Sequence, residues 1–230
     1  MSNILPIIYQ DEHLVVINKP ISLPVHKSKG MANDAPYVTK WLGQQLECSV
    51  YNVHRLDAKT SGILLLALSP EIATQLTEQF ARREVDKVYH ALVKGIPGEG
   101  VFNGKVKKAK RGNKATAETA YRTLRTVYTK WEHKGEENLP LSLVELKPTT
   151  GRWHQLRQHC SHDRHDIIGD AEHGDFPLNR LLAEMIGEKR LYLHACSLSF
   201  EHPVTKERMT FEEPTPPTFA ALLDLFDGES

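Results

Sequence analysis

The sequence predicts an α+β fold with a mixed, mostly antiparallel sheet and flanking helices. The expected strands are scattered between helices without the regular strand-helix-strand alternation of a doubly wound parallel sheet. Two short apolar runs at residues 5–9 and 14–18, joined by a polar turn, predict an opening antiparallel hairpin. With 230 residues, of which 40% are hydrophobic, the chain can bury one good core, so we expect a single domain over residues 1–230.

Helix signals occur in four segments. Asp34 and Pro36 are suited to begin a helix in which apolar residues recur at helical spacing as far as residue 46. Ser69 is a suitable cap for a second helix, which is expected to end near residue 83. The other two helices are expected at about 152–160 and 219–226.

Short apolar runs rich in β-branched residues predict the remaining strands. The first is expected over residues 87–94, and the turn-rich segment 95–100 follows it. A basic loop is expected at 105–114. Further strands are expected at 119–128 and 141–146, and in a final hairpin near 191–200.

The charges are balanced in total but separated along the chain. Lysine and arginine together number 29, as do aspartate and glutamate, yet acids collect after residue 200 and one run is purely basic. The basic side chains of that run are Lys105, Lys107, Lys108, Lys110, Arg111 and Lys114. Because phosphate binding depends on the local patch, this run is a candidate contact for nucleic acid. A solvated surface loop is the alternative interpretation.

Several classes of protein are disfavoured. The three cysteines form no paired motif, so neither a disulfide framework nor a zinc knuckle is indicated. The histidines between residues 154 and 194 lack metal-ligand spacing, and no metal site or cofactor is expected. Ser61 lacks the flanking glycines of a serine-hydrolase elbow. Because no signal peptide or membrane span is visible, a cytoplasmic protein without membrane contact is expected.

The most informative stretch is His54-Arg55-Leu56-Asp57-Ala58-Lys59-Thr60-Ser61-Gly62, which is followed at once by an apolar run. It places a carboxylate and a guanidinium two residues apart, directly before a buried strand. Three more segments stand out: Lys87-Val88-Tyr89-His90-Ala91, Thr150-Gly151-Arg152-Trp153-His154-Gln155-Leu156-Arg157-Gln158-His159 and Arg190-Leu191-Tyr192-Leu193-His194-Ala195.

These four segments, in this order, resemble the motifs of the RluA-type pseudouridine synthases, and the resemblance runs from about residue 5 to 215. Asn18-Lys19-Pro20 supports it, although Ser22 replaces the glycine usual in that family. Residues 171–175 with Asn179-Arg180 resemble the TruC-like, tRNA-modifying branch. The resemblance implies a pseudouridine synthase-like fold with a central active-site cleft, and with no S4-type RNA-binding domain ahead of Ile4 the catalytic domain itself must bind RNA.

The implied reaction isomerises a uridine in structured RNA, without a cofactor. The N1–C1′ bond breaks, the uracil turns over, and C5 joins C1′. The resemblance makes Asp57 the catalytic carboxylate, which either attacks C1′ or removes the 2′ proton. It places Tyr89 against the uracil and makes Arg157 the ion-pair partner of Asp57, because a guanidinium can offset the burial of a carboxylate.

Further residues are assigned to RNA by the same resemblance and by charge. A stacked uridine must flip out of its helix, and Arg55 is placed to fill the gap that it leaves. Leu193 is expected to form an apolar wall of the uracil site. Substrate contacts are also expected from His54 and Arg152, and contacts to the RNA backbone from Lys107, Lys108, Lys110 and Arg111.

Alternatives stay open at this stage. Transfer RNA is favoured over ribosomal RNA, and a monomer is expected. A non-catalytic RNA-binding protein or RNA chaperone on the same scaffold is the competing class, although it would have no need of Asp57, Tyr89 and Arg157 together. A metal-dependent hydrolase is a distant third.

Overall fold

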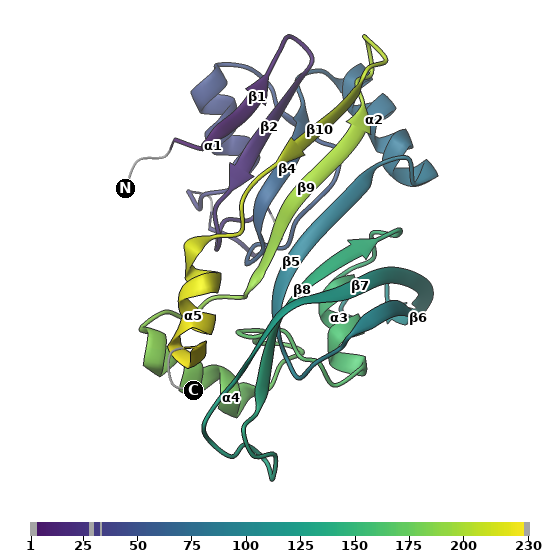
Figure 1. Ribbon diagram of the computed structural model, residues 1–230. Helices are drawn as coiled ribbons and strands as arrows, with labels where there is room; N and C mark the ends of the chain where they lie inside the picture. The colour runs from purple at the N-terminus through teal and green to yellow at the C-terminus, as the bar shows by residue number, and fades with distance from the viewer. Residues whose placement is uncertain (1–3, 28–29, 33, 228–230) are drawn as a thin grey trace. The chain divides into compact units, whose positions relative to one another are not determined.

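The computed structural model describes residues 4–27, 30–32 and 34–227, and the chain divides into two compact units (Figure 1). The first unit comprises Met1–Lys87 and Ala195–Glu213, and the second comprises Val88–His194 and Pro214–Ser230. The chain passes into the second unit within strand β5 and returns within strand β9. The predicted α+β class with a mostly antiparallel sheet is confirmed.

The sheet of the first unit confirms the predicted opening hairpin and adds strands to it. Its strands are β1 (Ile7–Gln10), β2 (Leu14–Lys19), β3 (Tyr51–Asn52), β4 (Ser61–Ala67), most of β9 (Leu193–Glu201) and β10 (Arg208–Glu212). Antiparallel pairs join β1 to β2, β2 to β4, β3 to β4 and β9 to β10. All seven residues of β4 are buried, as its continuous apolar run predicts. The final hairpin begins near the predicted position, but its second strand lies beyond residue 200.

Two helices belong to the first unit. Helix α2 (Pro70–Arg82) confirms the prediction: the Ser69 side chain accepts a hydrogen bond from the N–H of Ile72, and the helix ends where Arg83 adopts a φ of 63°. Its buried face packs into the core formed with β2, β4 and β9. Helix α1 (Val38–Leu46) begins four residues later than predicted, because residues 34–37 form a turn and extended chain.

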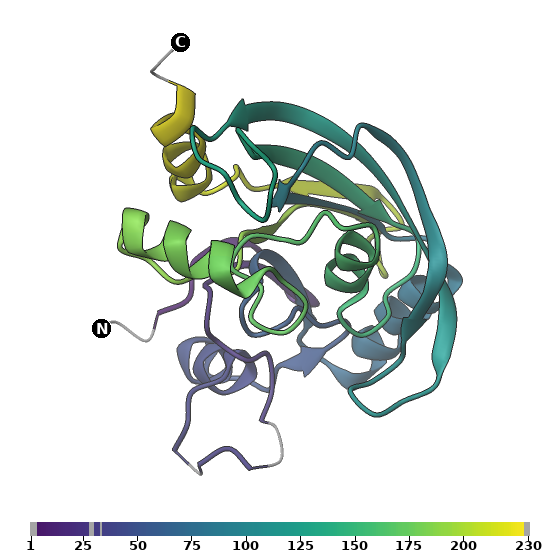
Figure 2. The same cartoon turned by 90° about the horizontal axis from the view of Figure 1, so that it is seen from below.

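The sheet of the second unit has four antiparallel strands in the order β5-β8-β7-β6. They are β5 (Asp86–Lys94), β6 (Glu99–Lys107), β7 (Lys114–Tyr128) and β8 (Pro140–Pro148). The helices are α3 (Gln155–His162), α4 (Phe176–Ile186) and α5 (Pro217–Asp227). Helix α3 packs against β6 and β7, and Figure 2 shows it within the curve of these strands.

The predicted basic loop at 105–114 is wrong in one respect: residues 108–113 form a loop, but the residues before and after them belong to β6 and β7. Strand β6 was missed because one of its faces is exposed and polar, so its alternation contains few apolar residues. The same reason explains why β7 begins five residues before the predicted start at residue 119. The basic side chains are therefore carried by a hydrogen-bonded hairpin.

Two helices differ from the prediction. Helix α3 begins at Gln155 and not at residue 152, because His154 has a φ of 47° and interrupts the helical geometry. Helix α4 was not predicted, although its signals are present. Asp175 accepts a hydrogen bond from the N–H of Leu178, a proline follows in the first turn, and Leu178 and Leu182 form the buried stripe.

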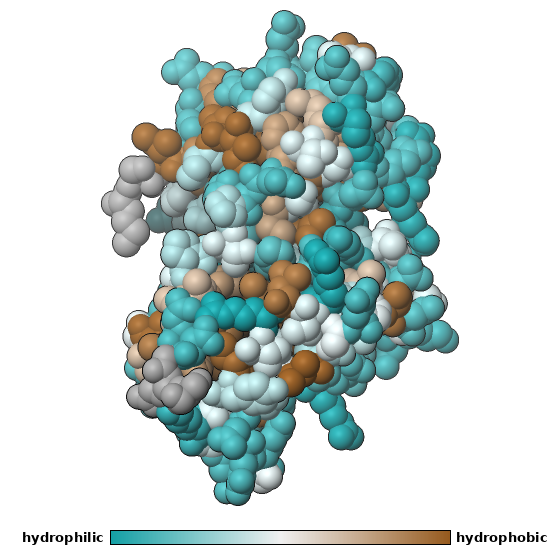
Figure 3. Space-filling view, viewed as in Figure 1, coloured by the Kyte–Doolittle hydropathy of each residue, from teal (hydrophilic) through white to brown (hydrophobic). Residues whose placement is uncertain are grey.

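Exposed apolar side chains are dispersed over the molecule. On the face drawn in Figure 3 they form small groups between polar side chains. The most exposed is Ile4, at 69%, and others lie on β6, β7, α4 and α5.

Candidate active site

Asp57 lies in the loop between β3 and β4 of the first unit. The side chains of Val53, Leu56 and Thr60 are buried and hold this loop against the unit. The N–H of Thr60 donates to the carbonyl oxygen of Asp57 across 3.0 Å, and Asp57 itself is half-buried. The carboxylate is therefore carried by a short turn at the start of a buried strand.

Gly62, the last residue of the motif, is required by close packing. Its φ is 107°, and a Cβ there would lie 2.2 Å from the carbonyl oxygen of Ala195. No other side chain fits in this place without moving the backbone. The glycine thus allows β4 and β9 of the first unit to approach each other directly after the loop that carries Asp57.

Lys19 is a member of this site that the sequence analysis did not single out. Its side chain is fully buried, and Nζ donates to the carbonyl oxygens of Pro20, Leu23 and Ala58 at 2.7, 3.0 and 3.1 Å. The third bond reaches the residue directly after Asp57. Burial lowers the pKa of Lys19 to about 7, and the negative charge of Asp57 opposes this shift. The signals in the sequence are a lysine that ends an apolar strand and its place in Asn18-Lys19-Pro20, which was used only to support the family resemblance.

The turn after Lys19 contains Ser22, which has a φ of 62°. This is the left-handed region that favours glycine, and a serine occupies it at a cost of about 1 kcal/mol. The turn brings the carbonyl oxygens of Pro20 and Leu23 to the same Nζ. Ser22 therefore raises the conformational free energy of this turn, while the contacts of Lys19 are kept.

Replacing Lys19 with methionine is expected to destabilise the protein most at alkaline pH. Because the pKa of Lys19 is lower in the folded state, the unfolded chain binds more protons between the folded pKa of about 7 and the unfolded value of about 10.5. The stability that Lys19 contributes therefore rises with pH through this window. The difference in unfolding free energy between wild type and Lys19→Met, from denaturant titrations, should be larger at about pH 10 than at about pH 7.

Lys59→Met is the matched control, since Lys59 is exposed and lies in the same loop. Its replacement should change the unfolding free energy little, because the side chain is exposed. A Lys19→Met effect that is equally independent of pH would contradict the expected linkage.

The two other motif residues differ in their surroundings. Arg55 is exposed, whereas the ring of His54 stacks on Phe80 with centroids 4.6 Å apart. Nε2 of His54 accepts a hydrogen bond from the N–H of Leu65 at 3.0 Å. Burial, with a smaller effect from the Lys87 charge, lowers the pKa of His54 to about 3. These contacts are structural, so the substrate-binding role of His54 gains no support from them and stays a prediction.

Tyr89 and Leu193 share one apolar cluster of the second unit. Leu193 is buried in that cluster, and Tyr89 packs against it while half-buried. Tyr89 lies on β5 opposite Leu146 of β8, which belongs to the same cluster. The fold thus places in one apolar cluster the two residues that were assigned to the uracil, where an aromatic side chain can stack on the flat face of a base.

Arg157 projects from α3 and is buried, with an exposure of 3%. Its Nε and Nη2 donate to the two carboxylate oxygens of Asp170, both at 2.7 Å, and Nη2 also lies 3.3 Å from Glu172. Burial by itself raises the pKa of Asp170, but the hydrogen bonds and charge of Arg157 outweigh it, so the net pKa is lowered. An ion pair between Arg157 and Asp57, which lie in different units, stays a prediction.

The segment around Asp170 is held by close backbone packing. A Cβ on Gly169 would lie 1.6 Å from the carbonyl oxygen of Arg190, and one on Gly174 would lie 2.4 Å from that of Asp170. Asn179 accepts from the N–H of Gly169 at 2.7 Å and donates to the carbonyl oxygen of Asp170 at 3.0 Å. The segment that resembles the tRNA-modifying branch therefore supports the carboxylate that holds Arg157.

The basic residues of the β6–β7 hairpin are all exposed. The hairpin is connected to α3 through Gln158, whose Oε1 accepts from the N–H of Lys107 at 2.9 Å. Nε2 of Gln158 donates to the carbonyl oxygen of Trp153 at 2.7 Å. Arg152, also exposed, lies just before that tryptophan. One buried side chain thus joins the predicted backbone-binding residues to the helix that carries Arg157.

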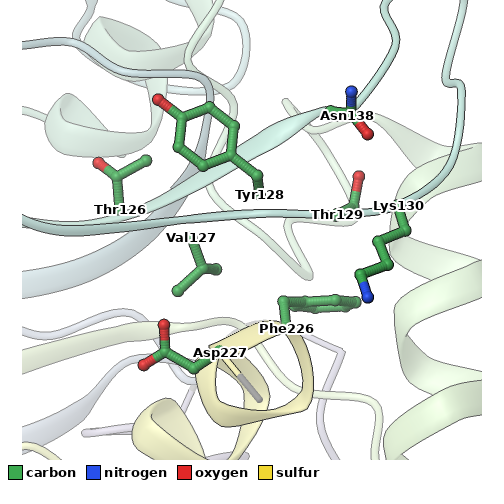
Figure 4. Close-up of a pocket in the computed structure, with 8 residues that line it drawn as sticks. All are labelled: Thr126, Val127, Tyr128, Thr129, Lys130, Asn138, Phe226 and Asp227. Atoms are coloured by element: carbon green, nitrogen blue, oxygen red, sulfur yellow. The ribbon is translucent and has the colours of Figure 1, made fainter. Parts of the chain in front are cut away.

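A separate hollow of the second unit lies between the end of β7 and α5 (Figure 4). Its volume is about 290 Å³. Its lining residues are Thr126, Val127, Tyr128, Thr129, Lys130, Asn138, Phe226 and Asp227, and none of them is a predicted site residue.

Two histidines of the second unit have ring nitrogens close to protein oxygen atoms. Nδ1 of His159 lies 3.0 Å from the Thr119 hydroxyl, and Nδ1 of His165 lies 2.9 Å from the Lys94 carbonyl oxygen. Within residues 4–27, 30–32 and 34–227, no group of three or more histidine, cysteine, aspartate or glutamate side chains is arranged to hold a metal ion. No helix in the described part of the chain is long and apolar enough to cross a membrane.

The chain is similar in sequence to known proteins. Residues 13–162 match the family described as RNA pseudouridylate synthase. The tRNA pseudouridine synthase C of Yersinia pestis is 42% identical over 217 residues, which cover 90% of this chain and 84% of that protein. The protein of the same name from Vibrio parahaemolyticus is 38% identical over 236 residues, covering 98% of this chain and 96% of the relative.

Solved structures show the same similarity. Human RNA Pseudouridylate Synthase Domain Containing 1 superposes with a TM-score of 0.75 at 26% identity, covering 96% of this chain and 88% of that one. Human RNA Pseudouridylate Synthase Domain Containing 4 gives a TM-score of 0.70 at 28% identity, covering 98% and 94%. With its four motifs in order and in this fold, the chain belongs to the RNA pseudouridylate synthase family and is of the RluA type.

Proposed function

We propose that this chain converts one uridine of a transfer RNA to pseudouridine, with Asp57 as the catalytic carboxylate. The observation that carries the proposal is the loop of Asp57, which is held by buried Lys19 and by a glycine that no other residue can replace. Relatives named tRNA pseudouridine synthase C, which match over most of the chain, support transfer RNA over ribosomal RNA.

The chemistry requires no net change in atoms. In one route a carboxylate oxygen of Asp57 attacks C1′ as the N1–C1′ bond breaks, and C5 of the turned uracil then displaces it. In the other route Asp57 removes the 2′ proton, which leaves a glycal that accepts C5 at C1′ as the proton returns. In both routes the C5 proton is finally lost and N1 gains one. Tyr89 stacks on the uracil and places its hydroxyl near the C5 proton.

The remaining residues bind and position the RNA. The target uridine flips out of its stack, Arg55 occupies the gap, and Leu193 forms an apolar wall of the base pocket. Arg157 pairs with Asp57 and keeps it ionised. The two compact units act as one catalytic domain, as a monomer in the cytoplasm.

The direct test is pseudouridine mapping of cellular RNA with and without this gene. We expect one or a few transfer RNA positions to lose pseudouridine when the gene is deleted, and to regain it with the wild-type gene but not with Asp57→Asn. Loss of sites only in ribosomal RNA would overturn the choice of transfer RNA. Unchanged maps of both RNA classes would overturn the proposed activity.

Replacing Lys107, Lys108, Lys110 and Arg111 together with alanine should weaken RNA binding and flatten its salt dependence. With each phosphate contact that is lost, fewer counterions are released on binding. The slope of log K against log salt should therefore become less negative by up to about 3 or 4. Turnover at saturating RNA should change little, because a phosphate contact takes no part in breaking the glycosidic bond. Filter binding at several salt concentrations and single-turnover rates provide the two measurements.

Arg55→Ala is the contrasting variant. Arg55 acts only once the base has flipped. The substitution should therefore lower turnover more than it changes the slope of log K against log salt. If the quadruple variant keeps both affinity and slope, the hairpin is only a solvated surface.

A further inference from the structure

Two histidine rings lie beside the Arg157 guanidinium in the second unit. Nε2 of His154 is 2.9 Å from Nη1 of Arg157, and Nδ1 of His154 is 3.1 Å from Nε2 of His173. Trp153 stacks on the His154 ring with centroids 3.8 Å apart and an interplanar angle of 18°. The three groups thus form a chain from His173 through His154 to Arg157, and Trp153 covers its middle member.

The proton positions in this chain follow from the donors available. A guanidinium only donates hydrogen bonds, so Nε2 of His154 must carry a lone pair toward Arg157. A neutral His154 then has its proton on Nδ1, and this N–H points at Nε2 of His173. That nitrogen must accept, so a neutral His173 carries its own proton on Nδ1. Both neutral rings are therefore held in the less common tautomer, which carries the proton on Nδ1.

The remaining guanidinium nitrogens are already directed. Nε and Nη2 of Arg157 donate to Asp170, while His154 is the acceptor for Nη1. The same carboxylate accepts from the backbone N–H of Glu172 at 2.8 Å and of His173 at 3.0 Å. Arg157 and His173 are thus oriented by one buried carboxylate, and His154 joins them on the other side.

We propose that His173 and His154 are positioning residues that orient Arg157 through this hydrogen-bonded chain, and that the chain works only while both rings are neutral. The inference rests on the proposed role of Arg157 in supporting Asp57. It adds two residues to the machinery and makes the orientation of Arg157 dependent on pH.

One added proton breaks the chain at either ring. A proton on Nε2 of His154 would face the N–H of Arg157. A proton on Nε2 of His173 would face Nδ1–H of His154 and force the His154 proton onto Nε2, with the same result. The charged groups that act on His173 are Asp170, Arg157, Glu172 and His162; burial is the largest influence and lowers the pKa of His173 from its usual value of 6.5. The neutral chain is therefore complete at neutral pH and is lost at acid pH, once either ring gains a proton.

The test compares His154→Gln with His154→Met. Glutamine and methionine are nearly isosteric, both lose the stacking on Trp153, and both meet the same strain at a φ of 47°. Only glutamine offers an oxygen that can accept from Nη1 of Arg157, and it does not titrate. We expect the glutamine variant to keep single-turnover rates within about fivefold of wild type, and the methionine variant to lose about tenfold to a hundredfold, as for a hydrogen bond to a charged group.

The pH profile separates positioning from a merely structural role. Wild-type turnover on transfer RNA from cells that lack the gene should decline at acid pH, because burial lowers the pKa of His173 from its usual value. In the glutamine variant this decline should be smaller, since a glutamine side chain cannot gain a proton. Equal rates for the glutamine and methionine variants, with both folded by thermal unfolding, would overturn the proposal, as would an acid limb that is the same in wild type and glutamine variant.

Nitrogen-15 NMR of the histidine rings tests the chain without any activity measurement. We expect the resonances that disappear in His154→Gln to show the proton on Nδ1 at pH 7.5. A proton on Nε2 of His154 would overturn the proposed hydrogen-bonded chain. If the wild type turned over no RNA, the proposed function would fail. The NMR measurement would still show by itself whether the hydrogen-bonded chain exists.

Discussion

Asp57→Asn is expected to abolish pseudouridine formation while RNA binding survives. The amide is nearly isosteric but can serve neither as nucleophile nor as base, so turnover should fall by about 10⁴-fold or more. The loop should keep its shape, because Thr60 and Lys19 donate to backbone carbonyl oxygens of the loop, which the substitution leaves in place. Mass spectrometry of digested RNA measures turnover, and filter binding measures affinity.

The matched control is Asp34→Asn, the same chemical change at an exposed aspartate of the first unit. It should leave turnover unchanged. Measurable turnover by Asp57→Asn, once deamidation has been excluded by mass spectrometry of the protein, would remove Asp57 from the mechanism.

Arg157→Lys is expected to lower activity strongly and stability moderately. Lysine keeps the positive charge but loses the fork that binds both oxygens of Asp170 and the nitrogen that reaches His154. We expect turnover to drop by about a hundredfold or more and the free energy of unfolding to fall by about 1 to 3 kcal/mol, as for weakened hydrogen bonds between charged groups. Single-turnover kinetics and urea titrations provide the measurements.

The stability effect should depend on pH with a defined sign. Because the pKa of Asp170 is lowered in the folded state, the stability that its pairing contributes is present above the unfolded pKa of about 4 and is lost as pH falls through the folded value. The difference in the free energy of unfolding between wild type and Arg157→Lys should therefore become smaller at acid pH. Wild-type rates in this variant would show that another cation supports Asp57.

The prediction of the family came from local residue patterns. The four motifs lie in order along the chain, and each depends on a few neighbouring residues that can be seen without a structure. Helix α2 was equally accessible, because its cap at Ser69 and its apolar face are encoded within one segment. The same holds for β4, whose seven buried residues form one continuous apolar run.

Elements with a polar exposed face were less accessible. The β6–β7 hairpin was expected as a basic loop, since the alternation of β6 includes few apolar residues and its pairing with β7 is a contact between separate segments. Helix α4 carried a cap and an apolar stripe, so the signal existed and was overlooked.

The sequence by itself determined the class of fold and the family, and it is the source of the prediction that Asp57, Tyr89 and Arg157 are site residues. Only the tertiary structure decided what surrounds them. Burial of Lys19 depends on three carbonyl oxygens from two segments, and the partners of Arg157 come from residues both before and after it in the chain. Hydrogen-bond geometry and burial arise when distant segments pack together, and no local pattern of residue types encodes them.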